Sequence, residues 1–437
     1  MAGCQTYKAG TFDWPGSTGV FSVTGLGFQP QAVILFGGNR PEEDTHVLGR
    51  PGPGLFISMN GVSYTDLTSV VSLCLFLNGA SFTGGGTIGY GAIQSPTGCI
   101  RMCTDAASTA TIDYRATNMS FDADGFSFNV THTPASNRPI HWFAWGPAGS
   151  VATQTATMRE NINVLAQPFD AGFDAYSALI LTTVINDGAS FGEGSIQGQC
   201  WLSFGSEHDP QNESLTANWN RLEIYDNVIY GTSLGNQGFL DAFFNFFNQH
   251  VVSTVGPAYI EGGRNFETAS PSDRSEWVDT GGGESNEYHQ AIWWNGESWP
   301  YSIGSLPALG DTSVFPVHSN LENFGAVLFA TLTGINAADA GYFPLRWGFG
   351  ILTEDYQGCV VFGENGDFYQ STNKCLANVD GTNLAAVEGS FVGNAFELEG
   401  LESTFPAINV GVGFSCPAGA WIPQMYRWWR NPSPARA

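Results

Sequence analysis

Apolar runs recur along this chain at a spacing of about one domain. Three runs of nearly the same sequence begin at Ala32, Ala178 and Ala326, which lie 146 and 148 positions apart. A second apolar run follows each alanine after 23 residues, at Leu55, Trp201 and Phe349. The spacing is too long for a solenoid unit and matches a whole domain. Short alternating stretches, separated by Gly, Pro and Asn-Gly turns, are typical of strands. The pattern predicts an all-β fold of three tandem, related β-sandwich-like modules with little helix.

The repeat also divides the chain. We place the first module at residues 1–150, the second at 151–310 and the third at 311–420, followed by a tail of residues 421–437. The second module carries a polar stretch from about residue 262 to 287, which we expect to be a long loop. With 437 residues, the chain is long enough for each module to bury its own core.

The acidic net charge of the chain argues against two classes of binding partner. Charged residues make up 13% of the chain, about half the usual share, so Ser, Thr, Asn and Gln must supply much of the polar surface. The formal net charge of −25 repels phosphates and anionic lipids. We therefore expect neither a nucleic-acid partner nor a membrane partner. No apolar stretch reaches the length of about 20 residues that a membrane helix needs.

The eight cysteines and seven histidines do not form a metal-binding pattern. Cys99 and Cys103 have no second pair at the spacing of a zinc finger, and no two histidines are spaced as metal ligands. Residues 122–125 (DADG) resemble the start of a calcium loop but lack its later ligands. We expect no metal and no cofactor. If one disulfide forms, we favour Cys359–Cys375.

Sequence motifs for catalysis are weak. Residues 188–192 (GASFG) match the G-x-S-x-G nucleophile elbow around Ser190, but the following residues do not predict the helix that the elbow requires. Acidic groups such as residues 42–44 (EED) are available, yet nothing pairs two of them as glycoside hydrolysis demands. We therefore expect no catalytic residues and a protein that is not an enzyme.

The C-terminal tail differs from the rest of the chain. Residues 421–437 contain three arginines and no acid, so the tail carries +3 whereas the remaining chain carries −28. Arginine and tryptophan are enriched at interface hot spots. These residues predict an interface at Arg427, Trp428, Trp429 and Arg430. The alternative is a last strand that packs on its own module.

A second aromatic cluster suggests a different role. Aromatic rings stack on sugars, and nearby amides and carboxylates can hydrogen-bond them. The candidates for glycan binding are Trp293, Trp294, Trp299 and Tyr301. Because they belong to the closing strand of the second module or follow it, core packing is the favoured interpretation.

One sequence pattern points to a known class of proteins. It consists of residues 21–34 (FSVTGLGFQPQAVI), followed by residues 124–128 (DGFSF) and a Trp-rich closing strand. The pattern resembles repeated β-modules of tailed-bacteriophage virion proteins, which are encoded among minor tail, fibre or head-decoration genes. It is clear over residues 10–150 and weaker in the next two modules, which lack the Gly-Phe-x-Pro element.

The resemblance implies a structural virion component in the decoration, neck, tail or fibre class. Its partners would be other virion proteins and further copies of itself, and it would reside in the virion after assembly in the host cytoplasm. Two alternatives stay open. One is a lectin-like host-recognition protein that binds a surface glycan, and the other is a glycan depolymerase.

Overall fold

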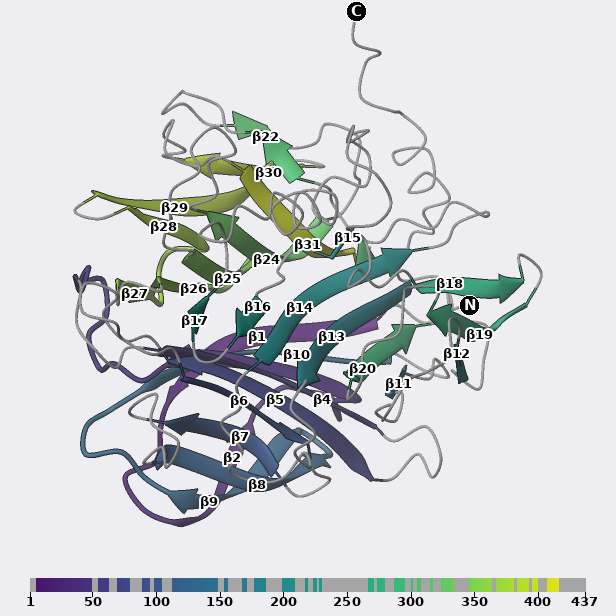
Figure 1. The fold of residues 1–437 in the computed structure, drawn as a ribbon, viewed down its shortest axis with the longest axis horizontal. Helices are drawn as coiled ribbons and strands as arrows, with labels where there is room; N and C mark the ends of the chain where they lie inside the picture. The colour runs from purple at the N-terminus through teal and green to yellow at the C-terminus, as the bar shows by residue number, and fades with distance from the viewer. Residues whose placement is uncertain are drawn as a thin grey trace, which may run out of the picture.

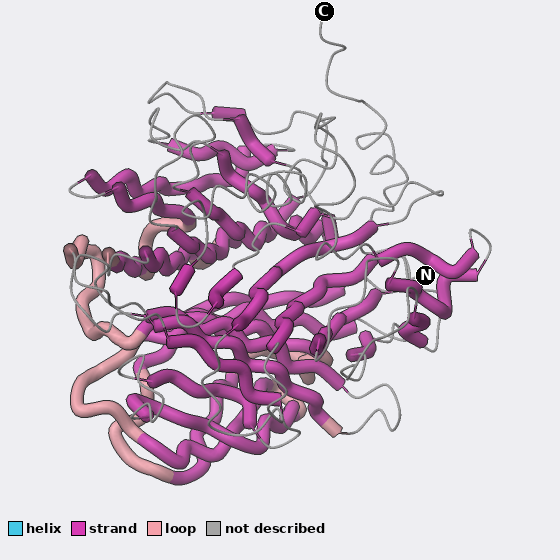
Figure 2. Tube along the Cα trace, viewed as in Figure 1, coloured by secondary structure: helices cyan, strands magenta, loops and turns pink. Residues whose placement is uncertain are grey.

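The computed structural model consists of antiparallel sheets (Figures 1 and 2). The described residues contain strands, turns and loops and no helix, which confirms the predicted all-β class. The structure describes residues 5–48, 54–62, 69–78, 89–94, 98–103, 112–147, 153–155, 167–170, 177–185, 199–208, 217–218, 223–225, 228–229, 266–270, 273–279, 287–294, 300–301, 305–307, 315–316, 324–333, 346–363, 367–380, 383–392, 395–399 and 407–415.

The N-terminal part forms a sandwich of two sheets. The large sheet has six strands in the order β1 (Gln5–Asp13), β10 (Pro139–Pro147), β3 (Ala32–Gly38), β4 (Gly54–Val62), β5 (Val70–Asn78) and β6 (Gly89–Gln94). The small sheet has four, in the order β2 (Gly19–Thr24), β9 (Gly125–His132), β8 (Ile112–Asp122) and β7 (Gly98–Cys103). One apolar cluster joins the facing sides of the two sheets.

The C-terminal part repeats this order. Its large sheet runs β21 (Pro300–Tyr301), β31 (Ala407–Ser415), β24 (Phe324–Thr333), β25 (Arg346–Thr353), β26 (Gln357–Gly363) and β27 (Phe368–Ser371), and β22 (Ser305–Pro307) also pairs with β31. Its small sheet runs β23 (Phe315–Pro316), β30 (Ala395–Glu399), β29 (Asn383–Val392) and β28 (Leu376–Asp380). Because β21 and β22 pair with β31, this sheet begins at Pro300, before the boundary expected after residue 310.

The middle part follows the same order with shorter outer strands. Its large sheet runs β11 (Thr153–Thr155), β20 (Glu287–Trp294), β13 (Ser177–Ile185), β14 (Gln199–His208), β16 (Glu223–Tyr225) and β17 (Val228–Ile229), and β15 (Ala217–Asn218) also pairs with β14. A three-stranded sheet contains β12 (Gln167–Asp170), β19 (Asp273–Asp279) and β18 (Phe266–Ser270).

The strands β18 and β19 correct one prediction. Residues 262–287 are not one long loop, because β18 and β19 pair as an antiparallel hairpin within this stretch. The few β-formers of the stretch fall in register, since Thr268 lies opposite Trp277 and Glu267 opposite Val278. The polar residues between them hid the strands in the sequence.

The alanines that start the three apolar runs occupy matching positions. Each lies next to the closing strand of its large sheet, opposite an aromatic residue, in the pairs Ala32–Trp145, Ala178–Trp293 and Ala326–Phe414. On its other side each alanine pairs with the next strand along the chain, in the pairs Ala32–Gly61, Ala178–Glu207 and Ala326–Thr353. The spacing in the sequence therefore corresponds to a shared register of strands.

Strand β3 is buried along its whole length, as a continuous apolar strand requires. Val33 and Leu35 belong to the core between the two N-terminal sheets. Phe36 lies on the opposite face and contacts Phe349 of β25, with ring centroids 6.3 Å apart. One face of this sheet thus packs inside its own sandwich and the other against the C-terminal one.

Candidate functional site

The residues predicted to form sites are only partly described. The interface candidates Arg427, Trp428, Trp429 and Arg430 lie outside the described residues, as do Trp299 and residues 188–192. Trp293 and Trp294 are neighbours on β20, in the middle large sheet. Tyr301 lies on β21, in the C-terminal large sheet. The described candidates for glycan binding therefore belong to two sheets.

The disulfide favoured from the sequence is wrong. Cys359 and Cys375 are free and buried, and so is Cys99, while Cys74 is likewise buried. Burial raises the pKa of the Cys359, Cys375 and Cys99 thiols above its usual value, which makes the reactive thiolate scarce. The Cys375 thiol donates to the carbonyl of Val387 at 3.4 Å instead of bonding to sulfur.

The two cysteine pairs occupy matching places in the N- and C-terminal sandwiches. In the large sheets, Cys74 pairs with Ser58 and Cys359 with Gly350. The Ser58 hydroxyl donates to the carbonyl of Cys99. At the matching position, a Cβ on Gly350 would collide with the carbonyl of Cys375. The small sheet thus approaches the large sheet closely at the same position in the N-terminal and in the C-terminal sandwich.

A carboxylate links the two sequence segments that carry the family resemblance. Asp124 accepts hydrogen bonds from the backbone N–H of Gly25 at 3.0 Å and of Gly27 at 2.5 Å. Both glycines have positive φ, at 84° and 80°, which other residues rarely adopt. At Gly125, a Cβ would collide with the Val23 carbonyl. We call Gly25, Gly27 and Asp124 the glycine clasp.

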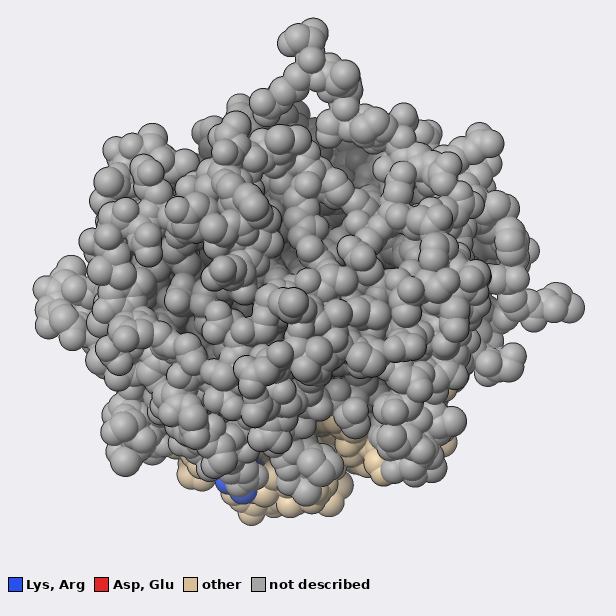
Figure 3. Space-filling model, turned by 45° about the vertical axis from the view of Figure 1, so that its right-hand side comes forward, with Lys and Arg blue, Asp and Glu red and all other residues tan. Residues whose placement is uncertain are grey.

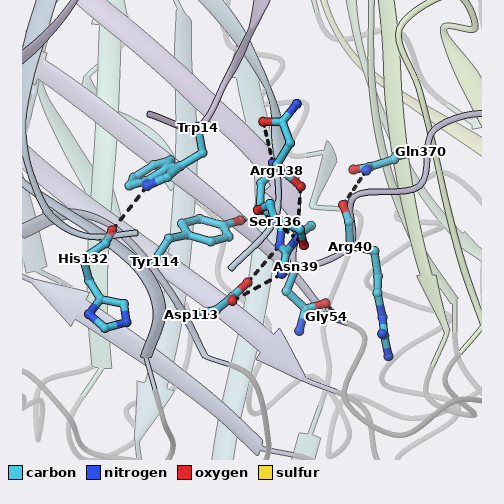
Figure 4. A network of polar contacts seen from close by, with 12 residues as sticks. Trp14, Asn39, Arg40, Gly54, Asp113, Tyr114, His132, Ser136, Arg138 and Gln370 are labelled. Carbon is cyan, nitrogen blue, oxygen red and sulfur yellow. Dashed lines mark hydrogen bonds and ion pairs between the residues drawn. The ribbon is translucent and has the colours of Figure 1, made fainter. Parts of the chain in front are cut away.

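A buried ion pair fixes the end of the N-terminal sandwich (Figure 4). The Arg138 guanidinium donates to both carboxylate oxygens of Asp113, at 2.9 and 3.3 Å. It also donates to the hydroxyl and the carbonyl of Ser136. Removing one partner of such a pair strands a buried charge, so this network stabilises a single arrangement of the loops that it joins.

The loop after β3 crosses to the C-terminal sandwich, and we call its residues 39–47 the strap. Val47 forms a two-way backbone bridge with Phe368 at the edge strand β27, with both hydrogen bonds at 2.9 Å. The backbone N–H of Asp44 donates to the carbonyl of Gln370 at 2.8 Å. The strap therefore adds an extra strand-like segment to the edge of β27 and covers donors and acceptors that could otherwise pair with another chain.

Side chains reinforce the strap. The Gln370 amide donates to the carbonyls of Arg40 and Glu42, at 2.7 and 3.0 Å (Figure 4 draws the first). The Asp44 carboxylate accepts from Tyr369 at 3.3 Å and from Asn373 at 3.4 Å. The acidic residues at 42–44 thus bind a strand from the far end of the chain.

A histidine lies at the centre of the same interface. His141 of β10 is fully buried, and its ring stacks on Phe36 with centroids 5.1 Å apart. Its Nδ1 lies 2.5 Å from the hydroxyl of Tyr356, which follows β25. A Cβ on Gly358 would collide with both of these atoms. The backbone at Gly358 therefore packs directly against the His141–Tyr356 pair and leaves no space for a side chain.

Burial also sets the protonation of the pair. Desolvation lowers the pKa of His141 from 6.5 to about 3, so the ring is neutral near pH 7. Desolvation likewise raises the pKa of Tyr356 above its usual value of 10. His141 is not accessible to a substrate, because it is fully buried between Phe36 and the hydroxyl of Tyr356. The geometry supports packing and not acid–base chemistry.

Figure 3 shows one face, on which the small part of the surface that is described is mostly uncharged, with some Lys or Arg. Among the described residues, no group of three or more His, Cys, Asp or Glu could hold a metal ion. No helix in the described part of the chain is long and apolar enough to cross a membrane.

The sequence hid the strap and the His141–Tyr356 pair. A signal did exist for the strap, in a charged loop directly after a fully apolar strand, but its partner lies more than 300 residues away. Comparison with known proteins gives no further guide, since no family model, curated protein or solved structure matches the chain.

Proposed function

We propose that this protein is a structural, non-enzymatic component of a tailed-bacteriophage virion, of the decoration, neck, tail or fibre class. The glycine clasp carries the proposal. It joins residues 25–27 to Asp124, the two segments on which the resemblance to phage β-modules rests. The pattern thus corresponds to a physical unit of the fold, in which two positive-φ glycines present N–H groups to one carboxylate.

The repeated architecture supports an assembly role. We infer that three copies of one β-module make up the chain, because the strand order recurs and the three alanines share a register. The buried cysteine pairs occupy matching places in the N- and C-terminal copies. Sheets that bury both faces provide a rigid body, which suits a part that other virion subunits pack against.

The described titratable groups do not favour an enzyme. His141 is neutral and sealed, and burial raises the pKa of the Cys99, Cys359 and Cys375 thiols, so none is an activated nucleophile. The side chains of Asp113 and Arg138 hydrogen-bond each other and are therefore not available to a substrate. These groups serve stability.

The register also bears on the lectin-like alternative. Trp293 lies opposite Ala178, at the position that Trp145 and Phe414 occupy in the other two large sheets. An aromatic residue there is a repeated element of the module, which favours packing over glycan binding. We therefore keep the virion proposal ahead of host-glycan recognition.

Purified particles provide the test. The protein should copurify with intact virions at a fixed ratio to the major capsid protein, measured by quantitative mass spectrometry through a density gradient. The basic tail enters the same experiment, since we propose that it docks on an acidic virion surface. Deleting residues 425–437 should leave a folded protein that no longer joins the particle, with wild type produced in parallel as the control.

Three results would contradict these proposals. Absence from purified particles would refute the virion assignment. Binding to host polysaccharide on a glycan array, together with absence from particles, would favour the lectin alternative, and release of reducing sugar would favour the depolymerase. Normal incorporation of the truncated chain would refute docking by Arg427, Trp428, Trp429 and Arg430.

A further inference from the structure

The three large sheets contact one another in every pair. Strands β1, β3 and β4 of the N-terminal sheet contact β26 of the C-terminal one, and β1 also contacts β25. Strands β21 and β31 of the C-terminal sheet contact β14 of the middle one, and β21 also contacts β13. Strand β11 of the middle sheet contacts β4 of the N-terminal one. The first sheet therefore contacts the third, the third contacts the second, and the second contacts the first, so that the three sheets form a closed cycle.

The contacts also share a direction. By position in the sheet, β1, β11 and β21 correspond, and so do β10, β20 and β31. Likewise β3, β13 and β24 correspond, and so do β4, β14 and β25. In each pair of sheets, the first strand of one sheet (β1, β21 or β11) meets one or two inner strands of the next sheet. A head-to-tail contact of this kind forms a ring when its rotations close.

We propose that the chain is a single-chain equivalent of a homotrimer, in which three modules close a head-to-tail ring in the order first, third, second. The small sheets then lie on the outside. Figure 1 shows β2, β7, β8 and β9 at the lower margin, β28 to β30 toward the upper margin and β18 and β19 at the right. The large sheets lie between them.

The contact between the N- and C-terminal large sheets, which we call the first joint, fits this order. His141 on β10 lies opposite Phe36, and it meets Tyr356 of the next module in the ring. The same register position on the other closing strands holds a polar residue of similar shape, in the pairs His289–Thr182 and Asn409–Ala330. The repeat thus places a residue with a planar, hydrogen-bonding side chain at this register position in all three closing strands.

The ring points to a kind of partner. A closed ring uses its head-to-tail surfaces internally, so a second copy cannot add to them. The proposed ring therefore favours a monomer that contains its own trimer over the homo-oligomer expected from the sequence. Three like modules around one axis match a partner with threefold symmetry, so one chain occupies one threefold position. This last step rests on the proposed virion function.

Solution measurements on the full chain test the ring independently of the virion. Native mass spectrometry should give a monomer of 46.8 kDa. Small-angle scattering should give a radius of gyration of about 22 Å for one compact body, against about 33 Å for three modules in a row. A value near the larger figure, or a homotrimer, would overturn the ring.

A charged joint gives a second measurement. His141→Asp places a carboxylate in the sealed interface and should raise the radius of gyration toward the larger figure, while circular dichroism retains its β signal. His132→Asp is the matched control, since His132 is exposed, and it should leave the radius unchanged. An unchanged radius for a folded His141→Asp protein would count against this joint.

Particle stoichiometry tests the partner. One chain per threefold position in the electron microscopy density supports the inference, and three chains around each axis contradict it. A compact monomer that is absent from particles would refute the virion proposal and the threefold partner while leaving the ring intact. The two failures are therefore distinguishable.

Discussion

Replacing His141 with asparagine should weaken the dependence of stability on pH below neutrality. Asparagine does not titrate, and it is the residue at the matching register position of the C-terminal sheet, Asn409. In the native protein His141 is fully buried and its pKa is lowered to about 3 by desolvation. The unfolded chain therefore binds a proton at a pH where the folded chain does not.

The sign and size follow from the two pKa values. With 6.5 in the unfolded chain and about 3 in the folded one, the contribution of the neutral ring is fully present above pH 6.5. It is lost progressively as the pH falls from 6.5 toward 3. Between pH 7 and pH 5, protonation of the unfolded state alone lowers the free energy of unfolding by about 2 kcal/mol.

Urea unfolding at pH 7 and pH 5 measures this effect. The loss of stability between the two pH values should be about 2 kcal/mol smaller in His141→Asn than in wild type, because all other groups are shared. His132→Asn is the control for the loss of a histidine outside this interface, since His132 is exposed. Equal losses for wild type and His141→Asn would refute the assignment of a neutral, sealed histidine.

Two further predictions concern the N-terminal sandwich. Gly27→Ala should lower the free energy of unfolding by about 1–2 kcal/mol, because φ is 80° at this position. Gly16→Ala is the control and should change the stability little, because the space around Gly16 is open. Equal melting temperatures for the two variants would contradict the glycine clasp. Asp113→Asn should cost about 3–5 kcal/mol by leaving Arg138 buried without its charge partner. Lys374→Met removes a surface pair and should cost less than about 1 kcal/mol, so a similar loss in both would argue against a buried network.

Local patterns predicted the strands well. The run that starts at Ala32 is apolar throughout because both of its faces are covered, and its 23-residue offset to the next run reflects the pairing of β3 with β4. The repeat was visible because each copy must place such a strand at the centre of a large sheet. Here sequence and structure share one physical cause.

Partners distant in sequence were not predictable in this way. The strap reads as a solvated acidic loop, and no local feature indicates that Asp44 meets Tyr369 and Asn373. The hairpin of β18 and β19 was missed because polar residues outnumber its few β-formers. The pairing of Asp124 with Gly25 and Gly27 required the register of two strands, although each segment stood out alone.

The strap has a consequence for the time course of synthesis. Asp44 and its partner Tyr369 are 325 residues apart. At a ribosomal rate of about 5–20 residues per second, the strap emerges roughly 15–65 s before the strand that it covers. During this interval Phe36 and the outer face of β3 lack their C-terminal partner. The nascent chain thus presents an apolar sheet face for many times longer than a β-hairpin takes to form, and this interval is when aggregation competes with assembly.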